Sequence, residues 1–200
     1  FMTANPQEAP QPPAPPNFNI ANVLTVIRLI LVPVFIWLML VPGVKAQVWA
    51  FVVFAVASAT DKLDGTLARK LNLITDFGKL ADPIADKALV LSAFVLLSLH
   101  WPVFWAVTVP VLVRELGITL MRLVLARRGR VMPASRGGKL KTVTQMALIL
   151  LLLIPWEALV PAAWPVVRIV AIILSVVVVV ITVFTGIDYV RQALRPAEQH

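Results

Sequence analysis

One stretch decides the fold: residues 51–99 read FVVFAVASATDKLDGTLARKLNLITDFGKLADPIADKALVLSAFVLLSL. Apolar residues fill both ends of this stretch, and the charged residues gather in its middle. Each apolar end belongs to a span near the ~20 residues that a helix needs to cross the hydrocarbon core of a membrane. Two such spans with a short connection predict an antiparallel pair of transmembrane helices.

The rest of the chain is equally apolar. Hydrophobic residues make up 60% of the 200 residues and charged residues only 14%, too few to cover a soluble core with polar surface. The apolar spans are continuous and lack the alternation of membrane strands, so we expect helices rather than a barrel. The predicted fold is an all-α integral membrane protein with six transmembrane helices, at residues 20–41, 47–69, 79–99, 102–126, 140–156 and 163–189.

The basic residues predict the orientation of these helices. Eleven of the 18 lie in or beside the connections after the second and fourth spans or after the sixth span, whereas only Lys45 and Arg168 lie on the opposite side. The positive-inside rule therefore places both termini in the cytoplasm. The other five basic residues lie inside the spans, where charge usually indicates function: Arg28, Lys62, Lys87, Arg114 and Arg122.

Composition also divides the chain and excludes several kinds of site. Residues 1–17 contain six prolines and predict a flexible segment, followed by one membrane domain at 18–192 and a tail at 193–200. No cysteine is present, so disulfides and thiolate sites are excluded. The two histidines, His100 and His200, have no partner in sequence, which argues against a zinc site or a Ser-His-Asp triad.

Four aspartates share two helical faces. Asp61 and Asp64 are three residues apart at the end of the second span, with Gly65 and Ala68 on the same face. Asp82 and Asp86 are four residues apart in the third span, on the face of Gly78. In an antiparallel hairpin the four carboxylates would meet near the cytoplasmic end of the second and third helices.

Four carboxylates at this depth require neutralisation, because each costs roughly 2.5–3.5 kcal/mol in the middle of a membrane helix. Hard divalent cations with oxygen ligands satisfy this need best, and the small residues beside them leave room for a ligand. Two alternatives remain open: a structural network of aspartates with Lys and Arg, and a divalent-cation transporter.

The spacing D-x2-D-G-x2-A-R-x8-G-x3-D-x3-D resembles the signature of the CDP-alcohol phosphatidyltransferases. All eight signature positions are present, namely Asp61, Asp64, Gly65, Ala68, Arg69, Gly78, Asp82 and Asp86. The resemblance implies a metal-dependent enzyme with Mg²⁺ or Mn²⁺, two ions held by the four aspartates, and Asp86 as general base. It also implies that the CDP diphosphate is bound by Asp61, Gly65, Ala68, Arg69 and Gly78.

Further segments are similar to the bacterial phosphatidylglycerophosphate synthase branch of that family, in an actinobacterial form. They are the Asn22-Val-Leu-Thr25-Val-Ile-Arg28 segment, the Arg114-Glu115 pair and the 133–145 stretch. The branch implies CDP-diacylglycerol and glycerol 3-phosphate as substrates, with Asn22 and Thr25 on the nucleotide side. An Ala at position 21 and Lys62 depart from the common pattern. Sister enzymes using inositol phosphate, inositol or serine stay open, as does an anchoring and capping role for Asn22, Thr25 and Arg28.

Glycerol 3-phosphate carries its own phosphate, so its enzyme needs cations that the metals do not engage. Arg114 and Arg122 share a stripe on the fourth span, and Lys139 and Lys141 begin the fifth. With Arg28, they are the candidate acceptor-phosphate ligands. Two alternatives stay open: Arg114 could instead pair with a carboxylate such as Glu115 of another subunit, and Lys139 could face only lipid head groups. We expect a multi-pass protein of a bacterial inner or plasma membrane, with its active site facing the cytoplasm, membrane lipid around it, no nucleic-acid partner and, by resemblance, a homodimer.

Overall fold

The computed structural model describes residues 20–70, 76–127 and 137–194, without the side chains of 20–22, 61–70, 76–83, 137, 139 and 194. The described residues form helices only, as predicted, and contain no strand. The six long helices are α1 (Ile20–Leu40), α2 (Val44–Lys70), α3 (Asp76–His100), α4 (Trp105–Arg127), α5 (Gly137–Leu153) and α7 (Trp164–Leu194). Three short ones separate some of them: η1 (Pro102–Phe104), α6 (Trp156–Leu159) and η2 (Pro161–Ala163).

These helices follow the predicted spans closely, with one difference. The fifth helix ends at Leu153 rather than at residue 156, because Pro155 cannot continue it, and α6 and η2 then lead into α7. By length and apolar composition, three described segments qualify as membrane spans: Val23–Leu40, Pro102–Arg127 and Pro161–Ala193. Val44–Thr60 and Leu140–Leu153 are shorter apolar helices, so the count of six spans stays a prediction.

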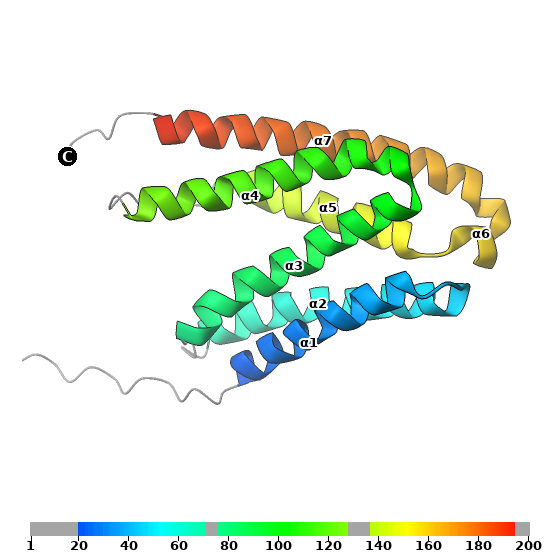
Figure 1. The fold of residues 1–200 in the computed structure, drawn as a ribbon, viewed down its shortest axis with the longest axis horizontal. Helices are drawn as coiled ribbons and strands as arrows, with labels where there is room; N and C mark the ends of the chain where they lie inside the picture. The colour runs from blue at the N-terminus through cyan, green and yellow to red at the C-terminus, as the bar shows by residue number, and fades with distance from the viewer. Residues whose placement is uncertain (1–19, 71–75, 128–136, 195–200) are drawn as a thin grey trace, which may run out of the picture.

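Figure 1 shows the helices in two groups. Helices α1, α2 and α3 pack together, and α7 packs on α4 and α5. Helix α3 also contacts α4 and α5, and α2 contacts α5, which joins the groups. The end of α2, the start of α3 and the end of α4 all lie at one end of the molecule (left in Figure 1), and α6 lies at the other.

The core is built from aromatic rings and small residues. The Phe35 and Phe54 rings lie 5.4 Å apart between α1 and α2, and Phe94 stacks on Phe104 at 5.8 Å. Ala50, Ala57 and Ala93 are completely buried, and such small side chains let membrane helices approach closely. Large apolar side chains also cover the outside, such as Phe184 at 75% exposure, as expected where lipid is the solvent.

The connection between α1 and α2 depends on a glycine. Gly43 has a φ of 117°, in the region that residues with a side chain rarely adopt. The preceding Pro42 cannot continue α1, and α2 begins directly after the glycine at Val44. This tight turn makes α1 and α2 an antiparallel pair over their whole apolar length.

Candidate functional site

All four signature aspartates lie in regular helix. Asp61 and Asp64 belong to the second half of α2, and Asp82 and Asp86 to the first half of α3. Helical spacing therefore gives each pair one face, as predicted. The side chains of Asp61, Asp64 and Asp82 lie outside the described residues, as do those of the remaining signature residues: Gly65, Ala68, Arg69 and Gly78. The predicted convergence of the carboxylates stays a prediction.

Asp86 is the one signature residue whose side chain is described. It is half-buried and lines a small recess of about 20 Å³ between α3, α4 and α5. Among the described side chains, no three Asp, Glu, His or Cys residues gather into a metal cluster. A metal site would therefore need the carboxylates of Asp61, Asp64 or Asp82 beside Asp86.

The polar residues of α1 face the interior of the protein. Thr25 is 1% exposed and Arg28 is completely buried. Both lie inside α1 rather than at its start, so the capping interpretation is wrong for Thr25. An interfacial anchor extends its charged group toward water, which the burial of Arg28 contradicts. Asn22 belongs to the same helix, but its side chain lies outside the described residues.

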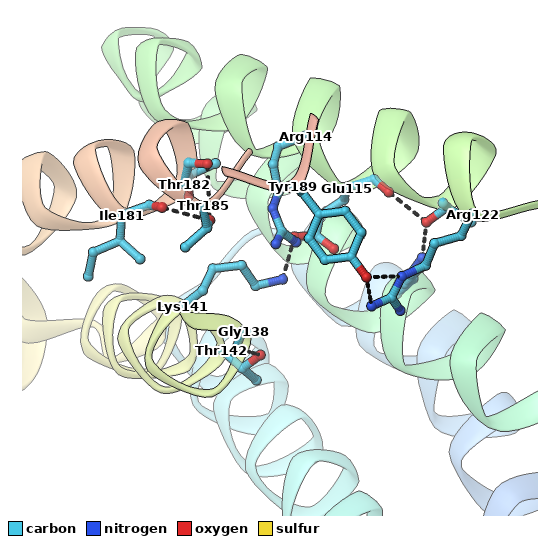
Figure 2. Close-up of polar contacts among 12 residues, drawn as sticks. Arg114, Glu115, Arg122, Gly138, Lys141, Thr142, Ile181, Thr182, Thr185 and Tyr189 are labelled. Atoms are coloured by element: carbon cyan, nitrogen blue, oxygen red, sulfur yellow. Dashed lines mark hydrogen bonds and ion pairs between the residues drawn. The ribbon is translucent and has the colours of Figure 1, made fainter. Parts of the chain in front are cut away.

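A buried carboxylate, Glu115 of α4, binds polar residues at the recess beside Asp86 (Figure 2). Its Oε1 accepts a hydrogen bond of 2.8 Å from Nη1 of Arg114 and another from Nζ of Lys141 on α5. Its main-chain carbonyl accepts one of 2.6 Å from Thr119, whose hydroxyl in turn accepts one from Lys87 of α3. Glu115 therefore connects three helices.

This arrangement decides one alternative left open by the sequence. Arg114 does pair with Glu115, and the partner is in the same chain rather than in another subunit. One carboxylate cannot neutralise two cations, however. Counted with Lys87 and Asp86, the formal charge around the recess is +1, so the cluster can still attract an anion.

Arg122 contacts Tyr189 of α7. Its Nε donates a hydrogen bond of 2.6 Å to the phenol oxygen, and its guanidinium lies 4.9 Å from the ring centroid. Tyr189, to which the sequence assigned no role, thus orients Arg122 (Figure 2). Lys139, another predicted member of the acceptor site, has its side chain outside the described residues.

Two residues of the recess were missed as candidates. Gln145 is 2% exposed, and its amide nitrogen has no hydrogen-bond partner among the described residues. Leaving a buried donor unpaired costs about 1–3 kcal/mol, so a polar ligand or water is expected there. Glu115 entered the sequence argument only as a partner of Arg114. A lone carboxylate in an apolar span is itself the signal that would have identified it.

Helix α7 packs against the Arg114 side chain, and Gly186 of α7 makes this close contact possible. A Cβ on Gly186 would lie 3.3 Å from Cγ of Arg114. Thr182, one turn earlier on α7, is completely buried. The Arg114 side chain therefore passes close to the backbone of α7 on its way to Glu115.

The sequence was also compared with known protein families and with individual proteins. The model of the CDP-alcohol phosphatidyltransferase family matches residues 18–187. A protein of Mycobacterium tuberculosis (strain CDC 1551 / Oshkosh), named "Probable phosphatidylglycerophosphate synthase", is 44% identical over 180 residues, 88% of this chain and 82% of the relative.

Two further relatives carry the name "CDP-diacylglycerol--glycerol-3-phosphate 3-phosphatidyltransferase". The protein from Bacillus subtilis (strain 168) is 40% identical over 150 residues, 68% of this chain and 77% of its own. The one from Escherichia coli (strain K12) is 37% identical over 182 residues, 88% of this chain and 96% of its own. The similarity therefore covers most of each protein.

The buried pair of Glu115 and Lys141 predicts a measurable coupling. Glu115→Gln should lower the free energy of unfolding in detergent by about 3–5 kcal/mol, because it leaves buried cations unpaired. Adding Lys141→Met should cost about 1–3 kcal/mol less than the sum of the single changes. Glu157→Gln, an exposed carboxylate without an ion pair among the described residues, is the control and should change stability by less than about 0.5 kcal/mol. Strict additivity would contradict the pairing.

Proposed function

Because the chain belongs to the CDP-alcohol phosphatidyltransferase family, we propose that it transfers the phosphatidyl group of CDP-diacylglycerol to glycerol 3-phosphate. The products are phosphatidylglycerophosphate and CMP. The observation that carries this proposal is the 44% identity over 180 residues with a relative named as a phosphatidylglycerophosphate synthase. Relatives at 37–40% identity carry the name of the same reaction.

In this reaction the acceptor hydroxyl oxygen bonds to the lipid-side phosphorus while the bond from that phosphorus to the CMP oxygen breaks. The carboxylate of Asp86 accepts the hydroxyl proton. Its half-buried position in the recess supports this role, because the recess lies beside the cationic cluster that would hold the acceptor. Gln145, with its unpaired donor, is a further group able to orient a hydroxyl there.

Asp61, Asp64, Asp82 and Asp86 would surround two Mg²⁺ or Mn²⁺ ions, and Asp86 would contact them only weakly, because a tightly ligated carboxylate is a poor base. Their fit rests on the donor chemistry, all carboxylate, and on the helical backbone that gives each pair one face. When bound, the ions would neutralise charge on the diphosphate. The small residues on the same faces, Gly65, Ala68 and Gly78, leave space for the nucleotide, with Arg69, Asn22 and Thr25 beside it.

The acceptor phosphate would bind where the described cations gather. Arg114 and Lys141 share Glu115, which holds both in fixed positions and leaves them an excess of positive charge. Arg122, oriented by Tyr189, and Lys139 would complete the site, and the buried Arg28 would approach it from α1. A neutral acceptor such as serine or inositol has no need of such a cluster.

We further propose that all six long helices cross a bacterial cell membrane, with both termini and the recess on the cytoplasmic side and two chains in a homodimer. The basic connections support the orientation. Helices α2, α3 and α5 carry the polar residues of the site. The apolar stretches Val44–Thr60 of α2 and Leu140–Leu153 of α5 are shorter than the other spans. A bundle interior would accommodate the polar residues of these three helices.

A panel of acceptors tests the proposed substrate. Purified protein with CDP-diacylglycerol and Mg²⁺ should release CMP with glycerol 3-phosphate. With inositol or serine it should release at least about a hundredfold less, because neither carries a phosphate for the cationic cluster, and with inositol phosphate it should release less than with glycerol 3-phosphate, because the bulkier ring must fit the same site. CMP and lipid product are measured together by chromatography. Efficient transfer to another acceptor would replace glycerol 3-phosphate. Metal flux into proteoliposomes without CMP release would indicate a transporter.

The aspartates should separate into two kinds. Asp61→Asn and Asp64→Asn should abolish turnover together with metal-dependent binding of CDP-diacylglycerol, because the diphosphate is held through the metals. Asp86→Asn should abolish turnover with little change in that binding, because the base acts on the acceptor. Binding is measured by titration calorimetry in detergent. Asp188→Asn, an exposed aspartate of α7, is the control. Full activity of either metal-site variant would refute the metal site, and equal losses at Asp86 would make it a metal ligand.

The orientation can be tested cleanly because the chain contains no cysteine. A single cysteine replacing Arg127, at the end of α4, should react with a membrane-impermeant maleimide only after the cells are opened. One replacing Lys45, at the start of α2, should react in intact cells. Both residues are exposed, so differences in labelling report the side of the membrane. The reverse pattern would invert the topology.

A further inference from the structure

A second, much larger cavity opens at the α6 end of the molecule and extends along α7 to Val180. It has a volume of about 770 Å³, within the ~300–1,000 Å³ of small-molecule sites. Residues of η1, α4, α6 and α7 line it. It begins at Trp101, fifteen residues after Asp86, which is about 22 Å along a helix. In Figure 1 this region is at the α6 end, opposite to the junction of α2 and α3.

The lining is almost entirely apolar, apart from Ser175 and two charged residues. These are Glu157 of α6 and Arg168 of α7. Both are exposed, and neither makes a hydrogen bond or an ion pair with any residue in the described part of the chain. This cavity, called the groove below, therefore carries one cation and one anion that form no ion pair with each other in the described part of the chain.

Neighbouring tryptophans indicate how deep Glu157 and Arg168 lie in the membrane. Trp101 and Trp164 line the groove, and tryptophan is enriched at the boundary between membrane and water. Arg168 follows Trp164 by one helical turn, and Glu157 follows Trp156 directly. Both charges therefore lie at the level of the lipid head groups. From Arg168 the lining of α7 continues to Val180, about 18 Å of helix, comparable to the ~15 Å of one leaflet's hydrocarbon.

We propose that this groove binds one phospholipid with an ethanolamine head group, from the leaflet opposite to the reaction. The Arg168 guanidinium would bind the lipid phosphate, and the Glu157 carboxylate would accept hydrogen bonds from the primary ammonium. One acyl chain would fill the apolar groove between α4 and α7. An anionic head group would satisfy Arg168 and be repelled by Glu157, and a choline head group offers no N–H donor.

The test is native mass spectrometry of the purified full-length protein, titrated separately with dioleoyl phosphatidylethanolamine, phosphatidylcholine and phosphatidylglycerol. One ethanolamine lipid per chain should bind at least about tenfold more tightly than the others, the scale of one charge-assisted hydrogen bond. Glu157→Gln should remove this preference. Arg168→Gln should weaken all three lipids about tenfold.

Two further variants separate the groove from the general lipid surface. Ala106→Trp adds bulk at an exposed position of the lining and should prevent binding, with Ser175→Leu as a second blocking variant if the first unfolds. Lys45→Gln, an exposed basic residue on the same predicted side of the membrane, is the matched control for Arg168→Gln and should change nothing.

Several results would overturn the proposal. Equal affinity for the three lipids, or an ethanolamine preference that survives Glu157→Gln, would remove the head-group assignment. Binding that persists in both blocking variants would place the lipid elsewhere. A dimer that Ala106→Trp dissociates, with lipid binding unchanged, would make a second copy of this chain the occupant of the groove.

Discussion

The buried charges of this molecule depend on one constraint: a charge inside an apolar bundle must find a counter-charge, on its own helix or on another. Glu115 meets that constraint for Arg114 and Lys141. Because Lys141 belongs to α5, its ion pair with Glu115 links α5 to α4. The recess beside Asp86 owes its shape to this contact, since Glu115 and Lys141 form two of its walls.

The constraint also explains why the two ends of the molecule differ. On the side of the molecule that carries Asp86, Glu115 and Lys141 form a buried ion pair, and α7 holds Arg122 through Tyr189. At the α6 end the helices are held by apolar contacts such as the stacked rings of Phe94 and Phe104, with the buried hydroxyls of Ser98 and Thr108 2.6 Å apart between α3 and α4. One end is suited to anionic chemistry and the other to lipid.

Much of this fold could be predicted from the sequence, because the hydrophobic spans and their connections are local signals. The helices, their approximate ends and the helical faces of the aspartates all follow from spacing. Which cation meets which carboxylate could not be predicted, since Arg122 and Tyr189 are 67 residues apart and only tertiary packing brings them together. The burial of Arg28 and the unpaired amide of Gln145 were beyond reach for the same reason. The short helices α6 and η2, which follow Pro155, were not predicted because their sequence has no clear hydrophobic periodicity.

The close approach of α7 to Arg114 has an evolutionary consequence. A Cβ at position 186 would meet Cγ of Arg114 at 3.3 Å, so the space that one residue leaves empty is occupied by the other. Substitution of the glycine is compatible with the bundle only if the arginine shifts or is itself replaced by a smaller residue. Positions 114 and 186 should therefore vary together among homologous chains, and a lineage that lost the arginine would be free to lose the glycine as well.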